Sequence, residues 1–514
     1  MKKNRFESYL ERAGLARKPH QFEAVEWCLD REVNGRTAGG HLKHRGGLIA
    51  DEMGLGKTIQ MLGTMASNPL LRTLIVVPLP LLDQWVAAAE RGGVFVPLVF
   101  HGQRKRGIGQ TELDQASVVI TTYGTLSSSI DLLSRKVWSR LICDEAHRLR
   151  NPKTRTHKSV AHLRARIRWF LTGTPVQNSK RDFYSLCRAL GLRPAYFTRR
   201  SNLPELARHF VLKRTKAGVG LGLPPLDQEQ ITVGWQDETE ARLAADIHAH
   251  LGFSKVSELG GAARGAASRG AFGEHHLAML VRARQACVHP PLLAGHLGAM
   301  VEAAPADKDW LSAGLEKSSK IQAVAEHIRG RSGSRSRKLV FCHFRGEIDA
   351  LTKALAARGI SASSLDGRTP LEERKEILEP RSNNDPVAAV SQIALQRRGI
   401  PIELIRSIKQ WLSGPEVLLL QIQTGCEGLN LQRFNEVYFV SPHWNPAVED
   451  QAVARCHRLG QQKPVRVFRF TMQGFDAART TISMEDYTKR VQLCKRRLVD
   501  ELETDAREGE RVEA

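Results

Sequence analysis

The sequence predicts an α/β protein with two domains, each built on a parallel sheet, and with helical insertions between and after them. Short apolar runs alternate with longer amphipathic segments from about residue 45 to 215, and the alternation returns after residue 337. Runs that are apolar on both faces are typical of buried parallel strands, and amphipathic segments between them are typical of crossover helices. The length of 514 residues and the hydrophobic content of 42% are enough for more than one substantial core.

The predicted strands follow one another in two groups. In the first domain they occupy residues 47–50, 74–78, 118–123, 141–144 and 169–172. In the second domain they occupy residues 338–344, 361–365, 417–422, 436–440 and 465–470. Helices are expected in the amphipathic segments that separate these runs.

Changes in composition suggest where the domains begin and end. We expect the first domain at 1–225, with its core at about 27–195, and a helical linker at 226–315. The linker contains a loop at 260–273 that is too rich in glycine and alanine to specify a packed element. The second domain is expected at 316–475, with a surface insertion at about 376–412. A C-terminal helix and a charged tail are expected at 476–514.

The charge balance favours a polyanionic partner. The chain has 76 Lys and Arg residues against 54 Asp and Glu residues, a formal net charge of +22. Nucleic acid is the natural partner for such an excess of positive charge. The alternative is that the additional lysines and arginines only solvate exposed helix faces.

The cysteines and the termini exclude several classes of protein. The eight cysteines form no C-x-x-C pair and have no histidine spacing suited to zinc. Most stand in apolar runs, so we expect buried free thiols in a reducing compartment. The sequence shows neither a signal peptide nor an apolar run that could span a bilayer. We therefore expect a soluble intracellular protein without a membrane partner.

A glycine-rich loop follows the first predicted strand. Gly54, Gly56, Lys57 and Thr58 come between a strand that ends near residue 50 and a helix that begins near residue 58. Glycines let backbone N–H groups approach phosphate, the lysine reaches the β and γ phosphates, and the threonine hydroxyl binds Mg²⁺. The first glycine of the general G-x-x-x-x-G-K-[ST] pattern is Asp51 here. A structural glycine turn is the alternative.

Two adjacent acids close a later strand of the same domain. Asp144 can hold Mg²⁺, and Glu145 can orient or deprotonate an attacking water. Acids at a strand end are more often surface residues when they stand alone. The phosphate loop upstream and His147 downstream favour catalysis.

Two arginines near the end of the second domain have the spacing of a charged helix face. If residues 451–458 are helical, Arg455 and Arg458 share one face with Gln451. Arginine directed at a γ-phosphate accelerates phosphoryl transfer by about 10³ to 10⁵. A solvated basic helix is the alternative.

Taken in order, these motifs resemble the Swi/Snf-type ATPases of helicase superfamily two, which carry a DEAH box. The resemblance covers nearly the whole chain, and Asp51 is itself typical of the family. Its motifs are residues 18–21, 50–60, 77–78 with 84–85, 121–123, 144–148, 171–178, 213–216, 284–290, 365–367, 425–431, 443–446 and 455–461.

The resemblance implies two RecA-like lobes that bind ATP and Mg²⁺ between them. It implies catalytic roles for Lys57, Asp144, Glu145, Arg455 and Arg458, and metal binding by Thr58 and Asp144. The residues that it places at ATP are Gln21, Asp51, Glu52, Met53, Gly54, Leu55, Gly56, Lys57, Thr58, Gly425 and Gln451. Gln21 would read adenine, and Gly173 and Thr174 would link the ATP site to nucleic acid.

The resemblance also implies that double-stranded DNA is the partner, and possible further partners are nucleosomes or a transcription or repair complex. Trp444 would belong to the element that couples hydrolysis to movement of the duplex, with core packing as the alternative. The expected DNA contacts are Thr121, Thr122, Phe344, Gln432 and basic residues around 331–337. Three positions depart from the family pattern, namely Gln421, Cys426 and Ala454.

Two other functions stay open at this point. One is a helicase that separates DNA or RNA strands. The other is an ATP-bound interaction subunit of a transcription factor that hardly turns over. The residues at 23–32 and 443–461 are similar to those of minimal members from large DNA viruses and of the repair branch. The location would then be the nucleus in a eukaryote, and otherwise the cytoplasm, a viral factory or a virion.

Overall fold

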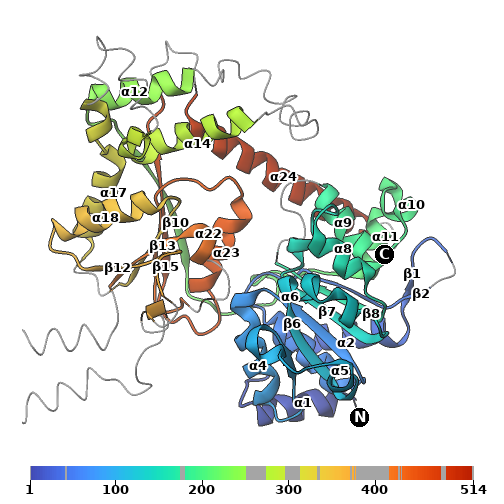
Figure 1. Ribbon diagram of the computed structural model, residues 1–514. Helices are drawn as coiled ribbons and strands as arrows, with labels where there is room; N and C mark the ends of the chain where they lie inside the picture. Colours follow the sequence, from blue (N-terminus) through green and yellow to red (C-terminus); the bar gives the residue numbers. More distant parts are fainter. Residues whose placement is uncertain are drawn as a thin grey trace, which may run out of the picture. The chain divides into compact units, whose positions relative to one another are not determined.

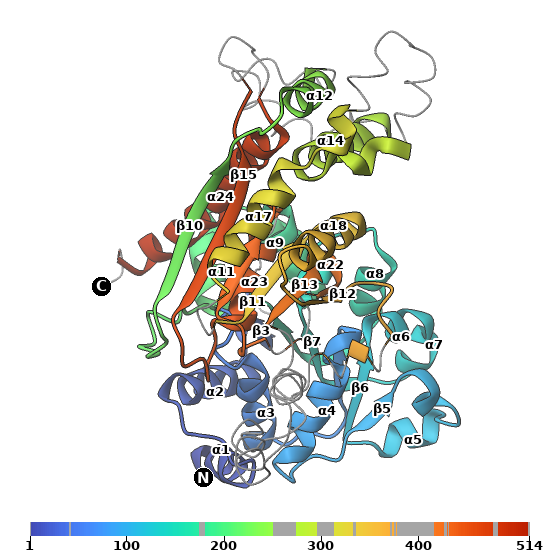
Figure 2. The same ribbon diagram turned by 90° about the vertical axis from the view of Figure 1, so that its left-hand side faces the viewer.

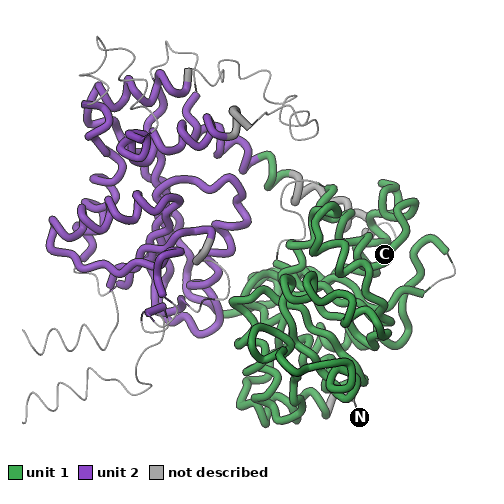
Figure 3. Tube along the Cα trace, viewed as in Figure 1, with its two compact units in different colours: residues 1–222, 494–514 green, residues 223–493 purple. Residues whose placement is uncertain are grey.

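The computed structural model divides the chain into two compact units. Unit 1 comprises residues 1–222 and 494–514, and unit 2 comprises residues 223–493 (Figures 1 and 3). The described residues are 2–40, 43–173, 180–249, 274–295, 313–332, 336–370, 373–374, 377, 416–425, 429, 431–475 and 482–511. The loop predicted at 260–273, Thr174 and nearly all of the insertion predicted at 376–412 lie outside them. None of the helices in the described part of the chain combines the length and hydropathy needed to cross a bilayer.

Unit 1 is built on a seven-stranded sheet in the order β5-β6-β4-β7-β8-β3-β9, and every pairing in it is parallel. Its strands are β3 (Gly46–Ile49), β4 (Thr73–Val77), β5 (Leu98–Phe100), β6 (Val118–Thr122), β7 (Trp138–Asp144), β8 (Ala165–Leu171) and β9 (Val211–Leu212). All the strands predicted for the first domain are confirmed. The sequence did not reveal β5 and β9, because runs of three and two residues are too short to show a period.

Helices cover both faces of this sheet. They are α1 (Lys2–Arg12), α2 (Pro19–Val33), α3 (Lys57–Ser67), α4 (Leu82–Arg91), α5 (Gln110–Gln115), α6 (Tyr123–Ser128), α7 (Ile130–Leu133), α8 (Arg155–His162), α9 (Lys180–Leu190), α10 (Pro194–Phe197) and α11 (Leu203–Phe210). Alternate side chains of β4 enter two separate cores: Ile75 packs with α1 to α4, and Leu74 packs with α6 and α8. A short antiparallel pair, β1 (Arg36–Thr37) and β2 (Lys43–His44), stands apart from the sheet.

Unit 2 is built on a six-stranded sheet in the order β10-β15-β14-β11-β13-β12, again with only parallel pairings. Its strands are β10 (Leu226–Val233), β11 (Lys338–Cys342), β12 (Ala362–Leu365), β13 (Val417–Gln421), β14 (Glu436–Phe439) and β15 (Val465–Met472). Its helices include α12 (Glu238–Ala249), α14 (Glu274–Val288), α17 (Ser319–Gly330), α18 (Arg345–Ala356), α22 (Ile422–Gly425) and α23 (Pro446–Cys456). The strands predicted for the second domain, and with them the fold class, are confirmed.

The prediction that the helical linker begins at residue 226 is wrong. Residues 226–233 form strand β10, which pairs with β15 along its whole length, as Figure 2 shows. The strand is at the edge of the sheet and most of its residues are exposed. Its polar sequence lacks the apolar run by which buried strands are recognised, and main-chain pairing with β15 decided its structure.

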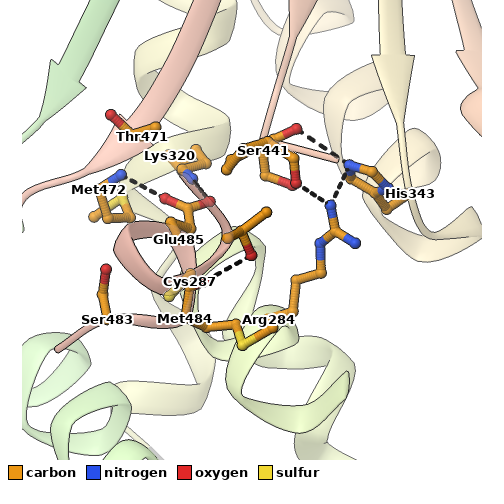
Figure 4. Close-up of polar contacts among 12 residues, drawn as sticks. Arg284, Cys287, Lys320, His343, Ser441, Thr471, Met472, Ser483, Met484 and Glu485 are labelled. Atoms are coloured by element: carbon orange, nitrogen blue, oxygen red, sulfur yellow. Dashed lines mark hydrogen bonds and ion pairs between the residues drawn. The ribbon is translucent and has the colours of Figure 1, made fainter. Parts of the chain in front are cut away.

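Buried ion pairs hold elements together in both units. In unit 2, Lys320 of α17 pairs with Glu485 of α24 (Met484–Arg511), and a Glu485 oxygen also accepts the Met472 N–H at 2.7 Å (Figure 4). In unit 1, Arg140 donates to both carboxylate oxygens of Glu32, at 2.6 and 2.5 Å. The indole of Trp169 and the amide of Asn68 also donate to Glu32, at 2.8 and 2.7 Å.

Replacing Glu32 by Gln is expected to destabilise unit 1 by about 3 kcal/mol or more, because it leaves the buried Arg140 charge without its partner. Urea unfolding followed by tryptophan fluorescence measures the change. The matched control is Glu326→Gln, since Glu326 makes ion pairs with Arg329 and Arg358 at the surface. Exposed pairs contribute roughly 0–1 kcal/mol. A shift for Glu32→Gln as small as that of the control would contradict the prediction.

Candidate active site

The phosphate loop lies between β3 and α3, at the carboxyl edge of the parallel sheet of unit 1. Gly54 and Gly56 have φ values of +97° and +81°, a region that side chains rarely adopt. A Cβ on Gly56 would stand 2.5 Å from the Gln21 amide nitrogen. The chain therefore needs glycine at these positions, and the first N–H groups of the eleven-residue helix α3 follow at once. Such a helix start is suited to binding an anion.

Lys57 is the first residue of α3 and folds back over the loop. Its Nζ donates to the carbonyl of Asp51 at 2.7 Å. A Cβ on Gly173, which follows β8, would lie 2.8 Å from Met53 Cγ and 3.7 Å from Lys57 Nζ. Gly173, two positions after the end of β8, is thus in close contact with the phosphate loop, and Thr58 follows Lys57 on α3.

Gln21 of α2 lies against the same loop. The side chain is buried and donates to the carbonyl of Leu55 at 3.3 Å, and the His20 ring contacts that carbonyl at 3.2 Å. The structure therefore brings Gln21 next to Gly56, although 35 positions separate them in the chain.

Asp51 was expected to contact ATP, but its side chain points to other residues of the protein. It is fully buried, and its carboxylate accepts hydrogen bonds from the Arg214 guanidinium and from the Gln60 amide. The neighbouring Glu52 accepts the N–H of Lys216 at 2.7 Å. Both carboxylates are engaged by protein partners, and because the Asp51 side chain is fully buried, only the backbone of Asp51 is placed to contribute to a ligand site.

The acidic pair closes β7. One Asp144 carboxylate oxygen accepts the indole N–H of Trp85 at 2.7 Å, and the other accepts the N–H of Glu145 at 2.8 Å. Burial, together with the nearby Glu145 carboxylate, raises the pKa of Asp144 to about 6. Trp85 was recognised only as part of a motif, and its contact with Asp144 depends on the approach of α4 to β7.

Glu145 adopts a strained backbone conformation. Its φ is +48° and its ψ is +49°, the left-handed region, which costs a residue with a side chain about 1–3 kcal/mol. The Glu145 carboxylate lies 3.3 Å from His147 Nδ1 and is nearly buried. Strain of this kind persists where the surrounding structure fixes it, which is typical of functional sites.

In unit 2, the condition set for the two arginines, a helix through residue 458, is not met. Helix α23 ends at Cys456, so Arg455 is in its last turn and Arg458 follows it, with its N–H bonded to the Cys456 carbonyl. Burial first, and then the positive charge of Arg455, lower the pKa of Arg458. Gln451 is buried, and its amide nitrogen has no hydrogen-bond partner within the described residues. Gly425 is the last residue of α22.

The predicted DNA contacts at the end of β6 conflict with the burial of their side chains. Thr121 is fully buried and donates to the carbonyl of Phe100 at 2.8 Å. Thr122 caps α6 and accepts the N–H of Thr125 at 3.2 Å. Neither hydroxyl is presented to solvent. Their effect is to shape this edge of the sheet.

The other expected DNA contacts are in unit 2. Phe344 is half-buried at the start of α18. Gln432 donates to the carbonyl of Leu459, in the turn that follows α23. The Trp444 ring packs against Tyr487 at 5.5 Å between centroids, so it contributes to the core of this unit. The basic segment at 331–337 is partly engaged, because Arg331 pairs with Glu436 at 2.6 Å.

Comparisons with known proteins identify the family. The model of the SNF2-related domain matches residues 20–292. The chain belongs to the Snf2 family of helicase-like ATPases. The model of the helicase conserved C-terminal domain matches residues 319–460, so the two parallel-sheet units correspond to the two RecA-like lobes of the Snf2 fold. The resemblance of the sequence motifs to the Swi/Snf-type ATPases is confirmed.

Several Snf2 relatives match most of this chain. A probable global transactivator of Orgyia pseudotsugata multicapsid polyhedrosis virus is 30% identical over 88% of this chain and 85% of its own length. The ATP-dependent DNA helicase DDM1 of Arabidopsis thaliana is 25% identical over 88% of this chain and 58% of its own. The mouse SWI/SNF-related matrix-associated actin-dependent regulator of chromatin subfamily A member 1 is 26% identical over 88% and 40%. The chain thus spans most of the viral relative but about half of the other two.

Proposed function

We propose that this Snf2-family chain is a DNA-dependent ATPase that uses ATP hydrolysis to move along double-stranded DNA. The observation that carries the proposal is that the phosphate loop lies at the same edge of the sheet as the acidic pair at the end of β7, in which Glu145 is strained. Together they supply a phosphate-binding loop and a candidate general base within one RecA-like lobe. The net charge of +22 and the relative named as a DNA helicase support a nucleic-acid partner.

We assign ATP to the loop from Asp51 to Thr58 and the adenine to Gln21. Backbone N–H groups of the loop and the Lys57 ammonium would hold the phosphates. Mg²⁺ fits the donor set, because Asp144 offers a buried carboxylate and Thr58 offers a hydroxyl, both oxygen ligands of the kind that Mg²⁺ prefers. When bound, the ion would draw negative charge from the β- and γ-phosphate oxygens.

We assign the chemical step to Glu145, Arg455 and Arg458. Glu145 would accept a proton from the water that attacks the γ-phosphorus. The bond from phosphorus to the β–γ bridging oxygen breaks, which releases phosphate and ADP. The two arginines would stabilise the charge that spreads over the transferred group. Gln451 shares α23 with Arg455, and we assign its amide to the same phosphate group.

ATP turnover measured with different nucleic acids tests the proposal. We expect duplex DNA to stimulate turnover by the full chain more than single-stranded DNA or RNA does, at one fixed salt concentration. Turnover unchanged by duplex DNA would refute the DNA-dependent function. If single strands stimulate best and a tailed duplex is separated, the chain is a strand-separating helicase instead.

The viral relative favours transcription as the setting of this activity. This chain matches 85% of the length of the viral relative, which is named a probable global transactivator. We therefore propose a second candidate, an ATP-bound subunit of a transcription complex. Slow turnover that no nucleic acid accelerates, together with tight ATP binding, would support this candidate over the translocase.

Trp85 is expected to position Asp144 for the metal ion. Replacing Trp85 by Phe removes the N–H donor and keeps an aromatic ring in the core. A hydrogen bond to a charged group contributes about 1.5 kcal/mol or more. The Mg²⁺ concentration for half-maximal turnover should therefore rise about tenfold.

The matched control for this variant is Trp138→Phe. Trp138 is equally buried and also loses an indole hydrogen bond, which it donates to the Leu133 carbonyl at 2.9 Å. The control should change the melting temperature without changing the Mg²⁺ dependence. The positioning role is refuted if both variants show the same Mg²⁺ dependence.

A further inference from the structure

The phosphate loop is attached to the last segment of unit 1 before the chain enters unit 2. Strand β9 pairs with β3, and two main-chain bonds continue this pairing toward the loop. Ala50 N–H donates to the Leu212 carbonyl at 2.7 Å, and Glu52 N–H donates to the Arg214 carbonyl at 2.9 Å. We call residues 213–222 the connector, since unit 2 begins at residue 223.

Arg214 of the connector binds Asp51 through three donors. Its backbone N–H and its Nε reach one Asp51 carboxylate oxygen at 3.0 and 3.2 Å, and its Nη2 reaches the other at 2.5 Å. Its Nη1 donates to the carbonyl of His20, the residue before Gln21, at 2.5 Å. One guanidinium thus joins the connector to the phosphate loop and to the start of α2.

Lys216, two residues further along the connector, binds the next acid of the loop, Glu52, in a similar way. Its N–H donates to one Glu52 carboxylate oxygen at 2.7 Å, and its Nζ lies 3.3 Å from the other. Backbone and side chain of the connector therefore hold two successive residues of the loop. The loop cannot move far without moving the connector.

The negative charges of Asp51 and Glu52 explain why the phosphate loop needs the cationic side chains of Arg214 and Lys216. Asp51 and Glu52 place two negative charges in a loop that is suited to an anion. Like charges close together in a partly buried site repel each other more strongly than they do in water. Without Arg214, the buried Asp51 carboxylate would repel a phosphate and would lose its strongest donors. A loop with glycine at this position, as in the general pattern, does not need this compensation.

We propose that Arg214 is a positioning residue of the phosphate loop, acting through Asp51 and supported by Lys216. The proposal rests on the proposed binding of nucleotide at this loop. Arg214 neutralises Asp51 and fixes the loop in the conformation that accepts phosphate. Because linkage is reciprocal, nucleotide in the loop in turn stabilises the connector.

A double-mutant cycle on Mg-ADP affinity tests the proposal in the full chain. We expect Arg214→Gln and Asp51→Asn each to raise the dissociation constant about tenfold, which corresponds to about 1.4 kcal/mol. The double variant should bind Mg-ADP no more weakly than the single variant with the lower affinity, because both substitutions remove the same interaction. Arg214→Lys should bind with intermediate affinity, since lysine keeps the charge but not the guanidinium fork.

The control variant is Arg106→Gln, at an exposed arginine of unit 1, which should bind Mg-ADP as the wild type does. Melting temperatures without nucleotide show whether each variant is folded. Effects of Arg214→Gln and Asp51→Asn that multiply in the double variant would overturn the proposal. Folded variants with wild-type affinity would overturn it as well.

Hydrogen exchange of the wild type provides a readout that does not depend on the variants. Mg-ADP should slow exchange of the connector, above all at the amides of Arg214 and Lys216, which donate to Asp51 and Glu52. Unchanged exchange in the presence of bound ADP would overturn the proposal even if Arg214→Gln does not fold. If the wild type binds no ADP at all, the proposed function has failed instead.

Discussion

Replacing Glu145 by Gln is expected to reduce ATP turnover by about 10²–10⁴-fold and to leave ATP affinity within a few-fold of the wild type. Glutamine has nearly the same size and fits the strained position after Asp144, but its amide cannot accept the proton of the attacking water. Phosphate release at saturating ATP and duplex DNA measures turnover, and a fluorescent ATP analogue measures affinity.

The matched control for this variant is Glu90→Gln, because Glu90 is an exposed acid on α4 of the same unit. The control should turn over ATP as the wild type does. Undiminished turnover by Glu145→Gln would remove Glu145 from the catalytic role and direct attention to another base. A loss of ATP affinity that equals the loss of turnover would show that the side chain serves binding instead.

Replacing Arg458 by Gln is expected to have the other large effect, a loss of about 10³–10⁵ in turnover at saturating ATP. The structure gives a physical reason. Burial and the adjacent Arg455 charge both disfavour the protonated form of Arg458 and lower its pKa. A negatively charged phosphoryl group in transfer would favour the protonated form of Arg458 and would itself be stabilised by that charge.

Arg466→Gln is the control for Arg458→Gln, since Arg466 is exposed on β15 of the same unit. Turnover by the control should match that of the wild type, and ATP affinity should change little in either variant. If Arg458→Gln hydrolyses ATP at the wild-type rate, the charge on the γ-phosphate is stabilised elsewhere. Arg455→Gln is then the variant to measure next.

The apolar strands were predictable because their burial on both faces leaves a continuous apolar run in the sequence. Strand β10 was not, since its side chains are mostly exposed and its structure depends on main-chain bonds to β15. Pairing between segments more than 200 residues apart leaves no local pattern. The same holds for β9, whose pairing with β3 carries the connector to the phosphate loop.

The sequence alone determined the order of the motifs, the two α/β domains and the chemistry that the phosphate loop and the acidic pair can support. Glycine, lysine and acid spacing along one segment is enough for that, because the requirements of a phosphate site are local. The tertiary structure decided what each side chain faces. It turned Asp51 away from a ligand role toward Arg214, placed the Trp85 indole on Asp144 and enclosed Thr121 in the core. Such contacts depend on how distant strands and helices pack, and no period or motif in the chain records them.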